Sequence, residues 1–487
     1  MRILFLDLDT LRTDHLGCYG YKRDTSPNID RIASKGVRFN KYYCTDAPCL
    51  PSRSALLSGR YGIHNGAINH GGEHADQSLE GTDRGFKTEF ARTNLIRVFR
   101  DAGYKTASIN SFAERHSSFW FNAGFNETYN NTGLMGNESA HEVLPDALSW
   151  IERNGANDNW LLHINMWDAH TPYRVPVEYG EPFENEPLSD WVTEEILKEH
   201  NLMAGPHKSL EVHMYNDIVS PKYPRYLGKV TTLQERKKLI DGYDIGIRYM
   251  DDHIGVILDA LKKQGVALDD LCVIVTTDHG ENLGELGIYS EHATADEPTC
   301  RIPMIIKWIG GKEGIVDDDL HANIDLCPTM ADLLGIEKHK IWDGQSYANV
   351  VKNGECQGRD YVVLSQCAHV CQRSVRFGKW LYMRTYHDGF HLFPKEMLFD
   401  IENDPYEQYD VAGKHPEVIN EAARLYLNWY DEMMETAASP TDPMRTIIQE
   451  GGPFHARGHL KAYAERLRAT GRGAAADKLT LRHPNEF

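Results

Sequence analysis

The sequence predicts an α/β protein with a large, mixed but mostly parallel sheet flanked by helices, and a smaller C-terminal subdomain of antiparallel sheet plus helix. Short apolar runs alternate with helical patterns through the first 355 residues, which is typical of parallel sheets. Beyond residue 355, short strands follow one another closely, which indicates an antiparallel sheet. We therefore expect a larger domain over residues 1–355 and a subdomain over residues 356–487.

The individual elements follow from the same patterns. The larger domain is expected to contain strands over residues 3–8, 37–43, 104–110, 160–166 and 271–277, and helices over residues 28–36, 93–103, 239–263 and 322–335. The subdomain is expected to contain strands over residues 361–364, 372–377, 380–384 and 396–400, and a helix over residues 416–435. Residues 174–235 predict an irregular insertion that can cap a site. For the tail after residue 439, a solvated segment or a dimer contact is favoured over one that returns to the site.

The composition restricts the partners of the chain. The formal net charge is -19, which argues against nucleic acid as a partner. No run is long enough to cross a bilayer, and the first residues enter an expected strand without the pattern of a signal peptide. The nine cysteines form an odd, loosely spaced set, which indicates a reduced chain. We therefore expect a cytoplasmic protein of bacterial type that binds neither nucleic acid nor membrane.

The most informative stretch is residues 49–60, CLPSRSALLSGR. Pro51 suits a first helical turn, and Gly59 can end the helix. A helix N-terminus carries unpaired N–H groups and partial positive charge, and Arg53 adds a planar, permanently charged fork. Cys49 therefore faces an anion site. The alternative is a structural cysteine before an amphipathic helix, since free cysteine is often buried.

Residues 49–60 resemble the signature of the type I sulfatases, a formylglycine-dependent family of the alkaline phosphatase superfamily, which reads Cys-x-Pro-Ser-Arg and later Leu-x-Gly-Arg. The resemblance implies that a formylglycine-generating maturation enzyme oxidises Cys49, and that the hydrated aldehyde attacks a sulfate ester. It also implies that Arg53 holds the sulfate in the catalytic site. An unmodified thiol would leave a stable adduct, so the oxidised residue explains turnover.

The resemblance further implies one divalent metal ion, which is usually calcium in this family. The implied ligands follow predicted strands and are Asp9, Cys49 in its oxidised form, Asp278 and His279. Many relatives have two adjacent acids at the first position, whereas here Thr10 follows the single acid. Asp7 lies on the same face of its strand as Asp9, and it is either a further ligand or a buried acid paired elsewhere.

Four further residues gain a role from the resemblance. The His-x-Pro-Tyr string after the strand at 160–166 recurs in sulfatases, and it gives His170 the role of general acid. The family's Gly-Lys-Trp-His string is missing, and we hypothesise that Arg115 and His116 supply its charge and its base. His292 stands where many relatives have a lysine that contacts the sulfate.

A Gly-rich loop after the signature carries a group of polar side chains, which are Arg60, His64, Asn65, Asn69 and His70. Loops often carry specificity, but Gly, Asn and His are also common in ordinary turns. We take His64 as the substrate-binding residue of this loop, and an ordinary turn is the alternative.

Together these positions predict a sulfatase that hydrolyses the sulfate monoester of a sugar. A glycosaminoglycan-derived saccharide that carries a uronate is the preferred substrate. Two alternatives stay open: a phosphonate or phosphate ester hydrolase with the same nucleophile, and a non-catalytic protein that binds sulfated glycans. An unrelated α/β enzyme with coincident strings is the least specific alternative.

Overall fold

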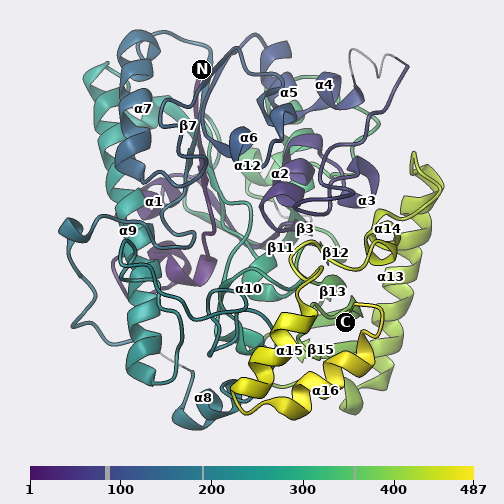
Figure 1. The fold of residues 1–487 in the computed structure, drawn as a ribbon. Helices are drawn as coiled ribbons and strands as arrows, with labels where there is room; N and C mark the ends of the chain where they lie inside the picture. Colours follow the sequence, from purple (N-terminus) through teal and green to yellow (C-terminus); the bar gives the residue numbers. More distant parts are fainter. Residues whose placement is uncertain (83–87, 189–190, 356–357, 487) are drawn as a thin grey trace.

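Two sheets organise the protein in the computed structural model, which describes all residues except 83–87, 189–190, 356–357 and 487. In this part of the chain, one sheet has eight strands in the order β11-β2-β10-β7-β1-β6-β4-β5, and another has five in the order β15-β14-β13-β12-β3. Figure 1 shows helices on both sides of the larger sheet and the smaller sheet at the lower right. The predicted fold class is confirmed, while the predicted boundary at residue 356 falls outside the described residues.

The larger sheet is parallel except around one strand. Its strands are β1 (Arg2–Leu8), β2 (Val37–Tyr43), β4 (Lys105–Ile109), β5 (Glu127–Tyr129), β6 (Trp160–Met166), β7 (Leu271–Thr276), β10 (Met304–Lys307) and β11 (Ile315–Ala322). β10 pairs antiparallel with both β2 and β7. Because β7, β1, β6 and β4 are parallel neighbours, their carboxyl ends meet at one edge, where open α/β sheets place their sites.

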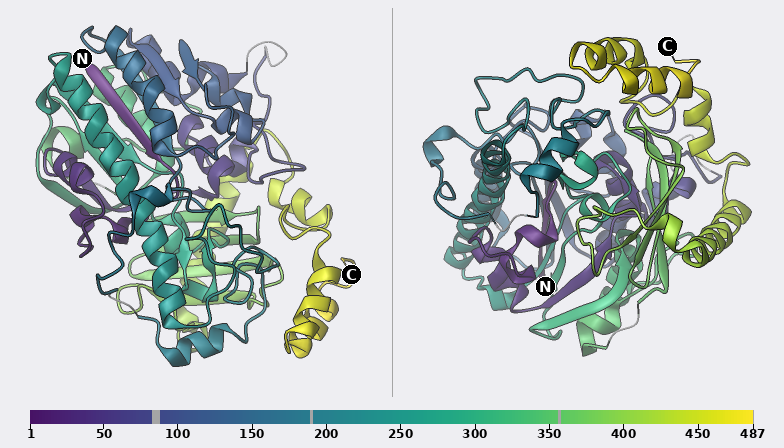
Figure 2. Two further views of the ribbon diagram at one scale, coloured as in Figure 1. Left: turned by 60° about the vertical axis from the view of Figure 1, so that its left-hand side comes forward. Right: turned by 90° about the horizontal axis from the view of Figure 1, so that it is seen from below.

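The central strand β1 is buried on both faces, so its alternate side chains enter two different cores. Ile3 and Phe5 pack on one face, against α2 (Cys49–Ser58), α5 (Leu95–Asp101), α11 (Leu326–Leu334) and α12 (Ala348–Asn353). Leu4 and Leu6 pack on the other face, against α1 (Pro27–Ala33), α7 (Ala140–Asn154) and α9 (Leu233–Lys263). The left view in Figure 2 shows α7 and α9 side by side along this second face.

Two differences from the predicted helix boundaries come from capping, and a third arises at α11, which begins at Leu326 instead of residue 322 because Ala322 belongs to β11. The helix expected over residues 93–103 is instead α4 (Glu89–Thr93) and α5, because Asn94 is extended and its side chain accepts the N–H of Arg97. α9 begins at Leu233, earlier than expected, because Thr232 and Glu235 form a capping box. The insertion contains α8 (Glu194–His200), and shorter elements are α3 (Gly62–Asn65), α6 (Phe112–Arg115), α10 (Glu297–Cys300), β8 (Asn282–Leu283) and β9 (Tyr289–Glu291).

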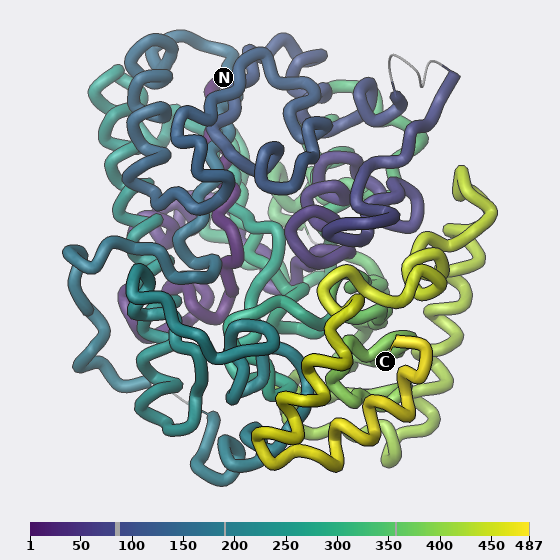
Figure 3. The backbone as a smooth tube through the Cα atoms, in the orientation of Figure 1, coloured from purple at the N-terminus to yellow at the C-terminus, as the bar shows by residue number. Residues whose placement is uncertain are grey.

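The expectation of a solvated tail is wrong. The tail forms α14 (Pro443–Gln449), α15 (Leu460–Ala469) and α16 (Gly473–Arg482), and α15 and α16 bury Leu460, Leu467 and Leu479 in a core with Phe390. Figure 3 shows the tail, in yellow, beside the insertion, where the Tyr463 hydroxyl donates to the Gly205 carbonyl at 2.8 Å. The apolar side chains of the tail recur at helical spacing, although polar residues separate them. This spacing explains why the tail folds into helices. Among the described helices, none is long and apolar enough to cross a membrane.

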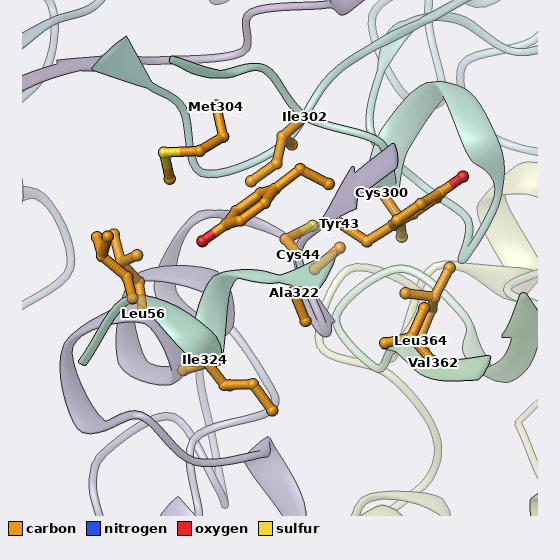
Figure 4. Close-up of a cluster of buried hydrophobic side chains, with 14 of the residues drawn as sticks. Tyr43, Cys44, Leu56, Cys300, Ile302, Met304, Ala322, Ile324, Val362 and Leu364 are labelled. Carbon is orange, nitrogen blue, oxygen red and sulfur yellow. The ribbon is translucent and has the colours of Figure 1, made fainter. Parts of the chain in front are cut away.

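The smaller sheet is joined to the signature segment. Its strands are β12 (Tyr361–Gln366), β13 (Cys371–Phe377), β14 (Trp380–His387) and β15 (Glu396–Asp400), with α13 (Pro416–Thr436) packed on it. The fifth strand, β3 (Asp46–Ala47), pairs parallel with β12 and ends two residues before Cys49. Figure 4 shows Tyr43 and Met304 from the larger sheet in one hydrophobic cluster with Val362 and Leu364 of β12. The two sheets therefore share a core beside residue 49.

Candidate active site

Cys49 is the first residue of α2, and its side chain is buried, with 1% of the residue exposed. Its Sγ lies 3.0 Å from Nε2 of His279, which follows β7. Burial, with the nearby carboxylates of Asp278 and Asp9, raises the pKa of this thiol well above its usual value. Unmodified Cys49 is therefore a protonated thiol and a poor nucleophile.

Arg53, one helical turn after Cys49, is fully buried among three carboxylates. Its Nε and Nη2 donate to Asp7 at 3.0 and 3.1 Å, and Nη2 also donates to Asp9 at 3.0 Å. Its Nη1 donates to Asp278. The guanidinium lies 4.8 Å from the ring centroid of Phe112. One permanent cation faces three acids, so the site has an excess of negative charge.

This excess fits a hard divalent cation. Ligand atoms of the four predicted residues, Asp9, Cys49, Asp278 and His279, all lie within 4.8 Å of one another. Burial raises the pKa of Asp278 to about 7, and Asp9 adds to this rise although Arg53 opposes it. Carboxylate oxygens suit calcium, and calcium stays a prediction. Asp7 is outside this group and instead holds Arg53 through both of its carboxylate oxygens.

His170 lies beyond the carboxyl end of β6 and is 6% exposed. Its Nδ1 donates to the Thr171 carbonyl at 2.6 Å, which leaves Nε2 for a substrate. The ring centroid lies 5.4 Å from that of His292 and 6.5 Å from that of His279. Burial lowers the pKa of His170 to about 3 although Asp9 opposes this, so the imidazole is neutral until an anion binds beside it.

His292 is held by an acid that the sequence reasoning missed. Its Nε2 lies 2.9 Å from the Glu291 carboxylate, and its ring centroid is 4.0 Å from that of His279. Burial opposes protonation, but Glu291 outweighs it and raises the pKa of His292. Glu291 also lies 3.1 Å from Nε2 of His207, which belongs to the insertion. The signal for Glu291 was its position next to a predicted site histidine.

The structure brings Arg115 and His116, at the end of α6, beside the same site. The Arg115 guanidinium lies 5.2 Å from the ring centroid of Trp167, which also faces Arg53 at 5.5 Å. The His116 ring packs 4.8 Å from Phe112, and both predicted residues are partly exposed. Burial, together with the charge of Arg115, lowers the pKa of His116 to about 3. A neutral imidazole of this kind can accept a proton.

The structure does not place His64 beside Cys49 and the other predicted site residues. Its Nδ1 lies 2.8 Å from the Asp343 carboxylate, and its Nε2 donates to the Met433 carbonyl at 2.8 Å. Burial opposes protonation, but Asp343 raises the pKa of His64. Nε2 therefore ties α3 to α13 and Nδ1 ties α3 to Asp343, between α11 and α12, so we leave His64 out of the site.

Three histidines that were not predicted as site residues reach the cluster from distant segments. His70 follows α3, His369 lies between β12 and β13, and His455 lies between α14 and α15. Nδ1 of His70 lies 3.1 Å from Nε2 of His455, and the rings of His369 and His455 stack with centroids 4.2 Å apart. The sequence carried a weak signal for His70, in a loop of polar residues, and for His455, in a tail able to return to the site, but none for His369.

Comparison with known proteins identifies the family. The sulfatase family profile matches residues 2–336, and the profile of the N-sulphoglucosamine sulphohydrolase C-terminal region matches residues 284–428. The chain is 25% identical over 448 residues to the uncharacterized sulfatase YidJ of Escherichia coli, with 84% of this chain and 82% of the relative covered. It is 22% identical over 484 residues to the N-acetylglucosamine-6-O-sulfatase of Bacteroides thetaiotaomicron, with 85% and 82% covered.

Solved structures agree on the fold. One protein, in complex with its substrate D-glucosamine-2-N,6-O-disulfate, superposes with a TM-score of 0.70 at 18% identity and covers 91% of this chain and 99% of that chain. The phosphonate monoester hydrolase of Silicibacter pomeroyi superposes with a TM-score of 0.67 at 20% identity, with 92% and 97% covered. Because the sulfatase profile spans more than half of the sequence, and the signature residues meet at one edge of the sheet, this chain belongs to the sulfatase family and is a sulfuric ester hydrolase.

Proposed function

We propose that the protein hydrolyses the sulfate monoester of a sugar, in particular of a glycosaminoglycan-derived saccharide. The observation that carries this proposal is the convergence at residue 49 of a buried arginine, an acidic donor set and a histidine whose Nε2 has no hydrogen-bond partner among the described residues. Relatives named for N-acetylglucosamine and N-acetylgalactosamine sulfates support a sugar as the leaving group.

The proposal includes oxidation of Cys49 to formylglycine by a maturation enzyme. In that form residue 49 supplies an oxygen nucleophile, which the protonated thiol cannot supply. Asp9, Asp278 and His279 would hold a divalent ion, whose positive charge would attract sulfate oxygens when it is bound.

The remaining side chains have distinct roles in this proposal. Arg53, aimed by Asp7, offsets the charge of the sulfate at the buried end of the site. His170 delivers a proton from Nε2 to the sugar oxygen, since a bound sulfate raises its pKa. His292, whose pKa is raised by Glu291 against the effect of burial, contacts the sulfate. Arg115 binds the substrate anion, and His116 is the base of the last step.

Relative activity on sulfate and phosphorus esters tests the reaction class. We expect kcat/KM for monosulfated saccharides and 4-nitrophenyl sulfate to exceed that for the matching phosphate and phosphonate esters by about 100-fold or more. The opposite order would favour the phosphonate or phosphate ester hydrolase, which can use the same nucleophile.

The chemical state of residue 49 separates a catalyst from a glycan-binding protein. Mass spectrometry of the peptide that contains residue 49 is expected to show the aldehyde after expression with a maturation enzyme. Cys49→Ala should fold, because the side chain is small, and should be inactive. An unmodified thiol in a protein that still binds sulfated glycans would support the non-catalytic alternative.

Chelation tests the metal. We expect a chelator of divalent ions to lower both activity and Tm, because Asp7, Asp9 and Asp278 then repel one another around a single arginine. Calcium should restore both quantities better than magnesium, since it tolerates irregular oxygen coordination. Full activity of metal-free protein would contradict the proposed site.

A further inference from the structure

Five histidines form an arc in the candidate active site, beside residue 49. Successive ring centroids are 5.2, 6.3, 5.8 and 5.4 Å apart in the order His116, His70, His369, His292 and His170. His455 of the tail packs against the middle of the arc, 5.3 Å from His70 and 4.2 Å from His369. His116, His70 and His455 are partly exposed, whereas the inner members are buried.

Four members of the arc have a ring nitrogen without a hydrogen-bond partner among the described residues. These atoms are Nε2 of His70, Nε2 of His116, Nδ1 of His292 and Nδ1 of His369. His292 and His369 are only 4% and 3% exposed, so their nitrogens have lost water without gaining a protein partner. Because burial of a polar atom without a partner is destabilising, the repetition of such atoms along one arc points to a ligand.

A second histidine cluster, near the C-terminus, provides a contrast. Nε2 of His387 and Nδ1 of His483 lie 3.0 and 2.9 Å from Glu486, and Nε2 of His483 lies 2.8 Å from Asp388. Nδ1 of His387 accepts the N–H of Gly389 at 3.1 Å. All four ring nitrogens are paired, so this cluster fastens the tail and offers nothing to a ligand.

A metal ion fits the arc less well than an extended ligand does. His70, His369 and His455 place ring nitrogens within 4.8 Å of one another, but a metal-bound histidine usually donates its other N–H to a carboxylate or carbonyl. Nε2 of His70 has no such partner among the described residues, and Nε2 of His369 lies 3.7 Å from Glu291, beyond hydrogen-bond length. The unpaired nitrogens also belong to four different histidines, and only two of these, His70 and His369, are in this group.

The charge state of the arc indicates the chemistry of that ligand. Burial, and then repulsion between neighbouring imidazoles, lowers the pKa of His70 and His369 well below the usual value. A neutral imidazole offers one donor and one acceptor, as a hydroxyl group does. Glu291, the acid at the inner end of the arc, pairs with His292 at 2.9 Å, so this pair offers no free cation to a carboxylate.

We infer that His116, His70, His369 and His455 form the subsite for the sugar ring that bears the scissile sulfate, and that this ring is an otherwise uncharged sugar such as an N-acetylhexosamine. The inference rests on the proposed sulfatase function and deepens it. It places any uronate of the substrate outside this subsite. It also makes the tail part of the active site, because the tail supplies His455.

Matched variants test the subsite. His369→Ala and His455→Ala are compared with wild type and with His459→Ala, whose side chain is exposed and stacks on Tyr215 at 4.7 Å. We expect the first two variants to lower kcat/KM for monosulfated N-acetylhexosamines, relative to 4-nitrophenyl sulfate, by about tenfold or more and mainly through KM. The control should keep the wild-type ratio. Equal losses on both substrates, or a wild-type preference for sulfated uronates, would overturn the inference.

Binding of unsulfated N-acetylglucosamine and N-acetylgalactosamine separates this inference from the proposed function, since it needs neither turnover nor a modified residue 49. Saturation-transfer NMR should detect binding of at least one of the two sugars to wild type and to His459→Ala, and not to His369→Ala. His455→Ala, in a half-exposed position, gives a second variant if His369→Ala does not fold. Binding that depends on His369 in a protein without sulfatase activity would support the subsite and reject only the proposed function.

Two results would reject the subsite itself. Wild-type protein that binds neither sugar would overturn it even if the enzyme were active. Co-purification of one equivalent of a transition metal with wild type would identify a metal site instead, provided that the metal is lost in both His369→Ala and His455→Ala.

Discussion

At the residue scale, Arg53 is the side chain that pairs with the three acids of the site. Lysine at this position keeps the charge but loses the fork that contacts Asp7, Asp9 and Asp278. We expect Arg53→Lys to lower kcat/KM by roughly 100-fold or more and to reduce the free energy of unfolding by about 3 kcal/mol. Enzyme assays and urea denaturation measure the two effects.

The control for this variant is Arg97→Lys. Arg97 is partly exposed and pairs with Asp101 across one helical turn, an interaction of little energetic weight. We expect neither activity nor stability to change in the control. Wild-type activity in Arg53→Lys would show that the fork is unnecessary.

The role of His170 can be recognised from the leaving group. A sugar alkoxide leaves poorly without a proton, whereas 4-nitrophenolate needs little help. We expect His170→Gln to lower kcat/KM for a sulfated sugar by roughly 10²–10⁴-fold and that for 4-nitrophenyl sulfate much less. Equal losses on the two substrates would assign His170 to sulfate binding instead of proton transfer.

The same residues show how far the site could be predicted. Asp9, His170 and Asp278 follow strands that the sequence identifies, and parallel strands bring such positions to one edge without further information. His369 and His455 lie in connections whose positions depend on the packing of the smaller sheet and the tail. Local patterns do not specify such long-range contacts.

At the element scale, α2 ends at Gly59, where a side chain would overlap its neighbours. Gly59 has a φ of 67°, and a Cβ there would lie 2.8 Å from Cδ1 of Trp342 and 3.0 Å from Cβ of Cys327. We expect Gly59→Ala to reduce the free energy of unfolding by more than about 2 kcal/mol, because it adds steric overlap to a left-handed backbone. Urea denaturation measures the loss.

Gly335 is the matched control for Gly59. It ends α11 with a φ of 72°, and apart from its chain neighbours no heavy atom of the described residues lies within 4 Å of its would-be Cβ. Gly335→Ala should therefore reduce the free energy of unfolding only by the cost of placing alanine in a left-handed backbone, about 1–2 kcal/mol. Equal losses at the two positions would mean that Trp342 and Cys327 move aside.

Elements were predictable where the local signal was strong. β2 spans the residues expected from its apolar run, and the capping box of Thr232 and Glu235 could have placed the start of α9. β3 has only two residues, and nothing in its own sequence indicates that it pairs with β12. A strand of that length exists only because a partner strand lies beside it.

At the scale of the whole molecule, the tail is fastened by charges that depend on pH. His483 lies between Asp388 and Glu486, and these acids raise its pKa to about 9 although burial opposes the rise. The folded pKa exceeds the unfolded value of 6.5, so this stabilisation is complete below pH 6.5 and is lost as the pH rises through 9. The pKa of Glu486 and of Asp388 is lowered to about 2, so their contribution is lost as the pH falls towards 2.

We therefore expect α15 and α16 to loosen at high pH while the sheets stay folded. Hydrogen exchange, corrected for the intrinsic rate, should be slower in these helices at about pH 6 than at about pH 9.5. His483→Gln should exchange faster at pH 6 and lose the alkaline dependence. Equal protection at both pH values in wild type would contradict this role of His483.

The pairing of β3 with β12 determines when, during translation, the segment around residue 49 can fold. Residue 49 is 1% exposed in the folded chain, so the proposed oxidation by a maturation enzyme requires access to Cys49 before folding buries it. Asp46 pairs with Ser365, so this part of the fold cannot close until the ribosome has made the C-terminal sheet. At about 5–20 residues per second, the time between synthesis of Asp46 and synthesis of Ser365 is roughly 15–60 seconds. The order of the strands along the chain thus leaves a period during translation in which residue 49 is still accessible.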